Sequence, residues 1–226
     1  MLKRLLKKIK YFKCLDQYPE FNMGSFLVAL FCTFLIIMAT FTPLHLWLLS
    51  IPADAFINPI NFFSQVKSIS DITIQYLYIP QIPAVLFIAA MLGPRIGLFS
   101  IAVYIGAGLL GFPVFASGGG VQYATQLVFG YILGYFVGVY LVGNILSAKA
   151  NFASTFRATL VGVFAVHLFG ILYLTIVLLL QHNSIFSVFG WIWALSGIQL
   201  PYDLLISFIA IVLARPGRAV FWMAMD

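Results

Sequence analysis

The chain has few charged residues. Asp, Glu, Lys and Arg make up 8% of its 226 residues, whereas about 25% is usual for a soluble domain. Hydrophobic residues make up 63%, and the mean hydropathy is +1.07. A soluble fold of this composition would have too little polar surface to present to water. The composition therefore predicts an all-α integral membrane bundle.

Cysteine is also rare, and recognisable catalytic motifs are missing from the sequence. Cys14 lies in a basic segment and Cys32 in an apolar run, so we predict neither a disulfide framework nor a zinc site. There is no G-x-x-x-x-G-K-[ST] phosphate loop, no H-E-x-x-H pair and no G-x-S-x-G turn. Nothing in these patterns indicates an enzyme, and we expect no cofactor and no metal.

Uncharged stretches of suitable length predict six transmembrane helices, since about 20 apolar residues cross a bilayer. Residues 1–21 form a basic tail, and residues 22–226 form a single membrane domain with a long outer loop at 43–75, which has room for a short interfacial helix. The expected spans are 22–42, about 80–92 with a start as early as Tyr76, two within 96–148 separated by Pro113 and Gly118–Gly120, 158–180, and about 201–214 with residues from 187–199.

The basic residues predict the orientation of the bundle. With the N-terminus inside, eleven of the twelve Lys and Arg residues fall in inner segments, as the positive-inside rule requires. Both termini are therefore expected in the cytoplasm. We interpret the basic tail as a determinant of topology that contacts anionic lipid, rather than as a nucleic-acid-binding segment.

Asp203 is the one acid within an apolar segment. An ionisable group at such depth is costly and commonly marks a functional site. A structural explanation is also available, because Pro201 suits the first turn of a helix and an acid there interacts favourably with the helix dipole. The two roles are compatible, and we predict a functional carboxylate.

The outer loop between the third and fourth spans is rich in glycine, aromatic and amide side chains. Three successive glycines allow positive φ values and close approach of another surface. A flexible connector would explain the glycines equally well, but the neighbouring side chains favour a segment that lines a ligand. The residues expected to do so are Phe112, Phe115, Gly118, Gly119, Gln122, Tyr123 and Gln126.

Small residues recur at every fourth position of two spans. Ser25, Ala29 and Thr33 on the first span would let another helix pack closely. That helix could belong to this chain or to a partner subunit. Three glycines at the same spacing within residues 130–138 favour packing inside the chain.

Two basic side chains have more than one interpretation. His167 lies near the middle of the fifth span and is interpreted as a neutral histidine hydrogen-bonded to a neighbouring helix, with a ligand contact as the alternative. Lys67 is the basic residue predicted on the outer side. It is interpreted as a solvated loop residue, with contact to an anionic substrate as the alternative.

Several blocks, in order, resemble the BioY family. They are 93–97 (GPRIG), 104–116 (YIGAGLLGFPVFA), the glycine triplet 118–120, 130–135 (GYILGY) and 200–205 (LPYDLL). BioY proteins are the membrane-embedded substrate-binding (S) components of biotin transporters of the energy-coupling-factor (ECF) type. The resemblance covers about residues 76–215.

The resemblance implies a biotin pocket open to the outside, in a multi-pass protein of a prokaryotic cell membrane. It also implies docking onto a membrane coupling subunit that two ATPase subunits drive, so the partners would supply ATP hydrolysis. By the resemblance, the small-residue face formed by Ser25, Ala29 and Thr33 would make that contact.

The sequence departs from the family pattern in two places. Leu127, Val128 and Phe129 stand where the family usually has Pro-Thr-Gly, and Ile206 stands where it commonly has a lysine suited to a carboxylate. The contact to a ligand carboxylate is then expected from backbone amides or Lys67. An S component for a different vitamin or small molecule therefore remains an alternative, as does a membrane assembly or enzyme subunit without a transported ligand.

A pocket for biotin should be mostly apolar with a few placed polar groups. We expect Asp203 to accept hydrogen bonds from the ureido N–H groups or to fix a neighbouring donor. Phe112 and Phe115 of the outer loop would form apolar walls together with Trp191. The expected polar edges are Gln81, Tyr104, Gln122, Tyr123 and Gln126.

Overall fold

The computed structural model describes residues 22–49, 59–66, 68–148, 151–182 and 184–225. The predicted basic tail, Lys67 and Lys149 lie outside the described residues. The chain divides into two compact units, of which Thr42–Ile79 is one and the rest of the chain is the other.

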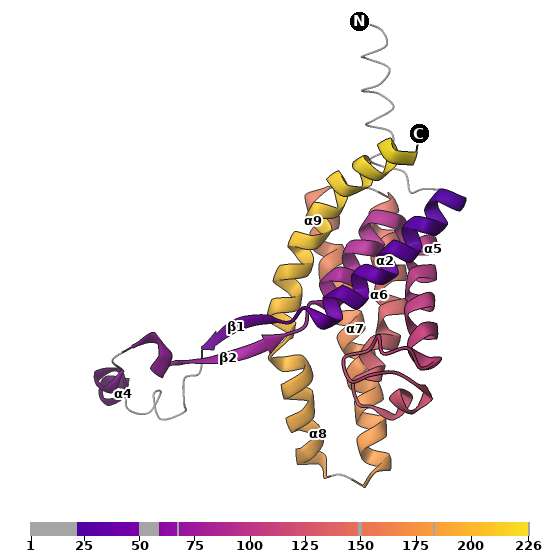
Figure 1. The fold of residues 1–226 in the computed structure, drawn as a ribbon. Helices are drawn as coiled ribbons and strands as arrows, with labels where there is room; N and C mark the ends of the chain where they lie inside the picture. The colour runs from indigo at the N-terminus through magenta and orange to yellow at the C-terminus, as the bar shows by residue number, and fades with distance from the viewer. Residues whose placement is uncertain (1–21, 50–58, 67, 149–150, 183, 226) are drawn as a thin grey trace, which may run out of the picture. The chain divides into compact units, whose positions relative to one another are not determined.

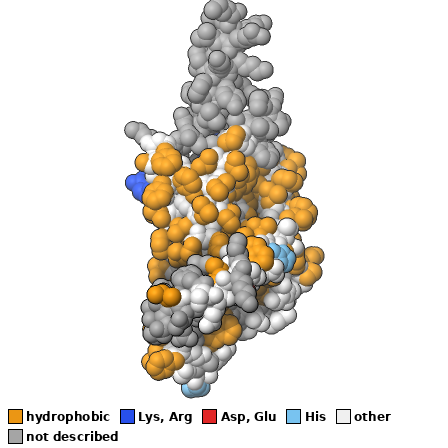
Figure 2. Space-filling model, turned by 90° about the vertical axis from the view of Figure 1, so that its left-hand side faces the viewer, with side chains coloured by type: hydrophobic (Ala, Val, Ile, Leu, Met, Phe, Trp, Pro, Cys, Tyr) orange, Lys and Arg blue, Asp and Glu red, His pale blue; other side chains and the backbone are white. Residues whose placement is uncertain are grey.

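Five helical stretches of the described chain are long and apolar enough to cross a membrane, judged by length and composition. Many of their large apolar side chains are exposed, as expected where lipid surrounds a helix. Figure 2 shows such side chains over much of the described surface on one face. Four of the stretches lie in α2 (Met23–Phe41), α5 (Gln81–Leu109), α6 (Phe129–Ala148) and α7 (Phe152–Leu180), and the fifth, Ile185–Arg218, runs into α9 (Leu200–Met225) (Figure 1).

Helix α5 reverses its direction at Gly93. This glycine has φ 78° and ψ −178° and precedes Pro94, so the helical backbone is interrupted there. The Gln81 side chain lies 3.1 Å from the Tyr104 hydroxyl, whereas a straight helix would separate 23 residues by about 34 Å. Residues 81–92 and 94–109 are therefore two antiparallel arms of a helical hairpin, and the predicted break at this position is confirmed.

Helix α2 packs on this hairpin through its small side chains. The Thr33 hydroxyl donates to the Ser100 carbonyl, and the Ser100 hydroxyl donates to the Ala29 carbonyl, both at 3.1 Å. Ser25, Ala29 and Thr33 are all buried within the chain. The structure uses the close approach of these three residues inside the bundle, which is one of the two alternatives that the sequence left open.

Helices α6 and α7 also approach closely, through glycines. A Cβ added at Gly130 would lie 2.2 Å from Cβ of Tyr173, and one at Gly134 would lie 2.9 Å from the Val166 carbonyl oxygen. Gly138 faces Val166 in the same way. The prediction that these glycines mediate packing within the chain is confirmed.

Helix α7 begins earlier than the polar residues around it suggested. Asn151 caps it, since its side chain accepts from the Ser154 N–H at 2.7 Å while the Ser154 hydroxyl accepts from the Asn151 N–H at 2.9 Å. This capping box satisfies backbone donors that would otherwise lack partners. The segment 149–157, predicted as a loop, therefore already contains the first turns of the helix.

Helix α7 ends at Leu180, and a last segment composed of three helical elements follows it. His182 has φ 59°, and Ser184 caps α8 (Ile185–Ile192), so the predicted break at 181–184 is confirmed. A π-helical turn, Trp193–Gly197, then leads to α9. Helix α9 begins at Leu200, close to the predicted start, but runs well beyond residue 214.

The second unit contains a β-hairpin that the sequence did not predict. Strands β1 (Leu44–Leu49) and β2 (Thr73–Tyr78) pair antiparallel, with Leu44 opposite Tyr78. A short helix, α4 (Pro59–Gln65), and a 3₁₀ turn (Ile69–Asp71) also belong to this unit. The expected short helix is present, whereas an early start of the second span near Tyr76 is wrong.

Candidate ligand-binding site

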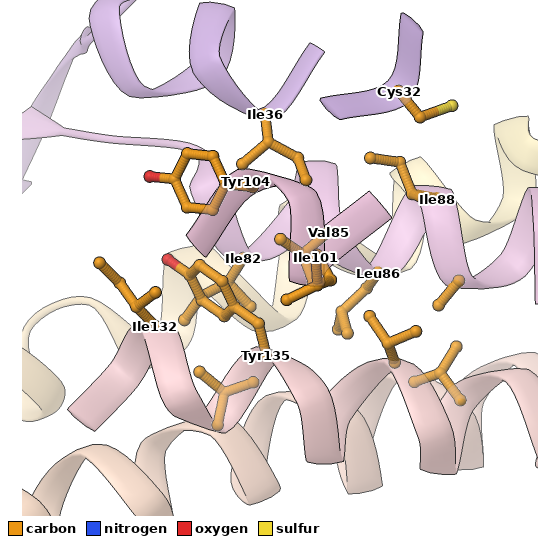
Figure 3. Close-up of a cluster of buried hydrophobic side chains, with 14 of the residues drawn as sticks. Cys32, Ile36, Ile82, Val85, Leu86, Ile88, Ile101, Tyr104, Ile132 and Tyr135 are labelled. Atoms are coloured by element: carbon orange, nitrogen blue, oxygen red, sulfur yellow. The ribbon is translucent and has the colours of Figure 1, made fainter. Parts of the chain in front are cut away.

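Gln81 joins three helical segments by hydrogen bonds. Its Nε2 donates to the Thr40 hydroxyl at 2.5 Å and to the Tyr104 hydroxyl at 3.1 Å, and its Oε1 accepts from the Tyr135 hydroxyl at 3.0 Å. Figure 3 shows the Tyr104 and Tyr135 rings at the same end of the apolar cluster. We call Thr40, Gln81, Tyr104 and Tyr135 the Gln81 cluster. It places donors and acceptors at the edge of an apolar core.

An aromatic layer adjoins the Gln81 cluster at Tyr104. The Phe115 ring lies 5.3 Å from the Tyr104 ring and 4.4 Å from the Tyr123 ring, measured between centroids. Phe129, at the start of α6, meets Phe115 at 6.5 Å. Such tilted and edge-on arrangements stabilise aromatic groups beyond the burial of their area. The layer presents aromatic surface of the kind that lines a pocket for a flat apolar ligand.

The outer loop brings Phe115 inward because glycine lies opposite it. A Cβ added at Gly108 would lie 2.0 Å from the Phe115 ring, so a larger residue would exclude the ring. Gly118 and Gly120 have φ 110° and 104°, and the Gly120 N–H donates to the Gly108 carbonyl at 2.7 Å. These positive φ values fold the loop back onto the end of the hairpin.

Tyr123 comes from a 3₁₀ turn, Val121–Thr125, outside the membrane-spanning helices. Burial raises the pKa of its hydroxyl, although a hydrogen bond with the Ser117 backbone opposes this effect. The phenol therefore remains a neutral polar group at physiological pH. The Tyr173 hydroxyl of α7 donates to the Ala124 carbonyl and ties this turn to the bundle.

Asp203 lies in a second polar group, which we call the Asp203 network. Its Oδ2 lies 3.1 Å from Nε2 of His167, and Nδ1 of His167 lies 3.0 Å from the Ser196 hydroxyl. The Ser196 hydroxyl is 2.6 Å from that of Tyr131. The prediction of a buried histidine hydrogen-bonded to neighbouring segments is confirmed, and Asp203 does lie in the first turn of α9.

The structure brings together only part of the predicted site. Gln81, Tyr104, Phe115 and Tyr123 form one continuous group. Phe112 and Trp191, predicted as apolar walls, are 61% and 44% exposed. The side chains of Gln122 and Gln126 are also exposed, and that of Gln122 donates to the Gly119 carbonyl of its own loop. Gly118 and Gly119 shape the loop backbone.

Sequence reasoning missed four polar residues of these two groups. Tyr131 and Tyr135 are four positions apart, a spacing that places both on one face of α6 and could have indicated them. Thr40 and Ser196 gave no such signal, because their roles depend on contacts with distant segments. Within the described ranges, no group of three or more His, Cys, Asp or Glu side chains is placed to hold a metal.

Comparison with known proteins identifies relatives of this chain. A protein of Lysinibacillus sphaericus, named as a probable biotin transporter BioY, is 42% identical over 66 residues, which are 29% of this chain and 34% of the relative. The biotin transporter BioY of Thermotoga maritima is 30% identical over 84 residues, 37% of this chain and 50% of that protein. The aligned stretches thus span half or less of these relatives.

A solved structure shares the fold. It is the S-component for biotin from an ECF-type ABC transporter, and it matches with a TM-score of 0.62 at 20% identity, covering 88% of this chain and 95% of that one. The model of the BioY family matches residues 20–222. Because this match extends over most of the chain, the protein belongs to the BioY family.

Proposed function

We propose that this protein is the membrane-embedded substrate-binding subunit for biotin uptake in an ECF-type transporter. The observation that carries the proposal is the match to the BioY family over residues 20–222. Two relatives named as biotin transporters and a biotin S-component of the same fold support it. In this role the chain binds the substrate and is not itself an enzyme.

The two polar groups suit the chemistry of biotin. A ureido ring both donates and accepts hydrogen bonds. We assign its N–H groups to the carboxylate of Asp203, and we assign its remaining hydrogen bonds to Gln81 and Tyr104. The apolar bicycle would lie against Phe115 and Tyr123. A mostly apolar site with few polar groups is typical of small-molecule pockets.

The biotin carboxylate needs a different partner, because Ile206 replaces the expected lysine. We assign it to the outer loop, through backbone amides of the segment around Gly119. A charged group that binds at the mouth of the site would remain partly hydrated, which lowers the cost of its burial.

Direct binding tests the substrate. Purified protein in detergent should retain labelled biotin, and Asp203→Asn should weaken binding at least about tenfold, since a hydrogen bond to a charged group contributes roughly 1.5–3 kcal/mol. Asp71→Asn is the matched control, because Asp71 is exposed and lies in the other unit. If the protein retains another vitamin in place of biotin, the result would favour an S component of different specificity. If it retains no ligand, the result would favour a non-transport role.

We also propose six membrane crossings with both termini in the cytoplasm of a bacterial plasma membrane. The hairpin at Gly93 supports the count, since it divides α5 into two antiparallel arms. In a Cys14→Ser background, Arg95→Cys and Phe112→Cys should react with an impermeant maleimide from opposite sides of the membrane. Native Cys32 is buried and should not react. Labelling of both positions from one side would contradict the proposal.

The remaining partners are proposed to be a membrane coupling subunit and two ATPase subunits. With Ala29 and its small neighbours buried, we place the contact on the exposed side of α2, where Leu27, Phe31 and Phe34 lie. Phe31→Ala should reduce co-purification with the coupling subunits while biotin binding persists. The control is Leu172→Ala, at an exposed position of α7. Equal co-purification of both variants would exclude this side of α2.

A further inference from the structure

We infer that His167 is a positioning residue that holds the carboxylate of Asp203 ready for ligand, at the end of a directed chain of hydrogen bonds. The inference rests on the proposed function only in assigning the ligand to Asp203. His167 and Asp203 are 2% and 1% exposed, and their side chains meet at 3.1 Å. A carboxylate so deeply buried requires compensating donors.

The direction of the chain follows from the chemistry of its end. The proposed function requires Asp203 to accept hydrogen bonds from the ligand, and a carboxylate that is ionised for this role can only accept. Nε2 of His167 then carries the proton and donates to Asp203. Nδ1 of the neutral imidazole then accepts from the Ser196 hydroxyl at 3.0 Å. The Ser196 oxygen in turn accepts from the Tyr131 hydroxyl at 2.6 Å. Each donor therefore points toward the next acceptor, and the series ends on Asp203.

Four different elements contribute to this series. Tyr131 belongs to α6, His167 to α7, Ser196 to the π-helical turn and Asp203 to the first turn of α9. The Tyr131 ring also meets the imidazole edge-on, with centroids 5.8 Å apart. Two contacts thus fix the plane of the imidazole, and the imidazole fixes the carboxylate. Among the described contacts of Asp203, His167 supplies a basic side chain.

Biotin binding tests the role of His167. His167→Leu removes the donor and should weaken binding about tenfold or more, as expected when a buried charged acceptor loses its partner. His167→Gln keeps an N–H near the same place and should restore binding to within a few-fold of the original. Ser196→Ala should give an intermediate loss, and His45→Gln, at an exposed histidine, no change. Equal losses in the Leu and Gln variants, with both folded, would overturn the inference.

A second measurement needs no ligand. The chain has three histidines, so ¹⁵N spectra of histidine-labelled protein contain few imidazole signals, and His167→Gln identifies that of His167. We expect a proton on Nε2 and none on Nδ1, and we expect Ser196→Ala to shift the Nδ1 signal. A proton on Nδ1, in the other tautomer or in an imidazolium, would overturn the directed chain. If the protein binds no biotin at all, the proposed function fails, while these spectra still decide the hydrogen-bond network.

Discussion

Arg218 donates a hydrogen bond from Nη2 to the carbonyl oxygen of Ala90, 128 positions earlier in the chain. In a continuous helix this carbonyl would accept from the N–H of the fourth residue onward. That residue is Pro94, which has no N–H. The guanidinium therefore satisfies a buried acceptor that the hairpin turn leaves without a helical donor, and it attaches α9 to the turn.

Loss of this contact should destabilise the bundle. Arg218→Met leaves a buried carbonyl without its donor, which costs about 1–3 kcal/mol, and it should lower the melting temperature in detergent. Arg95→Met removes the same charge from an exposed position on the turn and should have little effect. Equal melting temperatures for the two variants would show that charge, rather than the contact to Ala90, is what matters.

The hairpin turn should tolerate no side chain at Gly93. Its φ of 78° and ψ of −178° lie in a region that is essentially restricted to glycine, and strain there costs about 1–3 kcal/mol. Gly93→Ala is therefore expected to lower thermal stability. Gly106→Ala, on the second arm, meets no atom within 4 Å and should be neutral or slightly stabilising. The reverse order of stabilities would contradict the turn described here.

Close packing of α6 on α7 should depend on Gly130. An added methyl group would meet Cβ of Tyr173 at 2.2 Å, and overpacking of this kind costs about 1–3 kcal/mol. Gly130→Ala should thus melt at a lower temperature than the unmodified protein. Gly190→Ala in α8, where no atom lies within 4 Å, provides the control. A stable Gly130→Ala variant would mean that the two helices are farther apart.

The Gln81 cluster should affect both stability and binding. Gln81→Leu removes partners from the Tyr104 and Tyr135 hydroxyls, so we expect a loss of about 1–3 kcal/mol in stability. If the cluster also contacts the ligand, biotin binding should weaken about tenfold or more. Gln126→Leu, at an exposed position, should change neither. Melting curves and labelled-biotin binding on the same preparations separate the two effects.

Much of the helical framework was predictable because charge, glycine and proline mark it in the sequence. The first span was expected at 22–42 and is found at Met23–Phe41, and the breaks near Gly93 and at 181–184 are where the polar and turn-forming residues indicated. The β-hairpin was missed because LHLWLL in β1 is a short apolar run without alternation, which does not distinguish a strand from part of a helix.

The site was less predictable because its contacts join residues far apart in the sequence. Gln81 meets Tyr135 and His167 meets Asp203 only after helices pack, and no local pattern specifies those pairs. Small residues such as Ala29 indicate that a helix packs closely, but not which helix it meets. The partner became clear only from the contact between Ala29 and Ser100.

The position of Phe115 has a kinetic consequence. Its ring is fully buried between those of Tyr104 and Tyr123, so a ligand that enters this layer must displace the ring first. Displacement requires the outer loop to open, and opening has its own rate. In stopped-flow experiments the observed association rate should therefore level off as ligand concentration rises. Phe115→Ala, which removes the ring, should make the rate increase linearly over the same range.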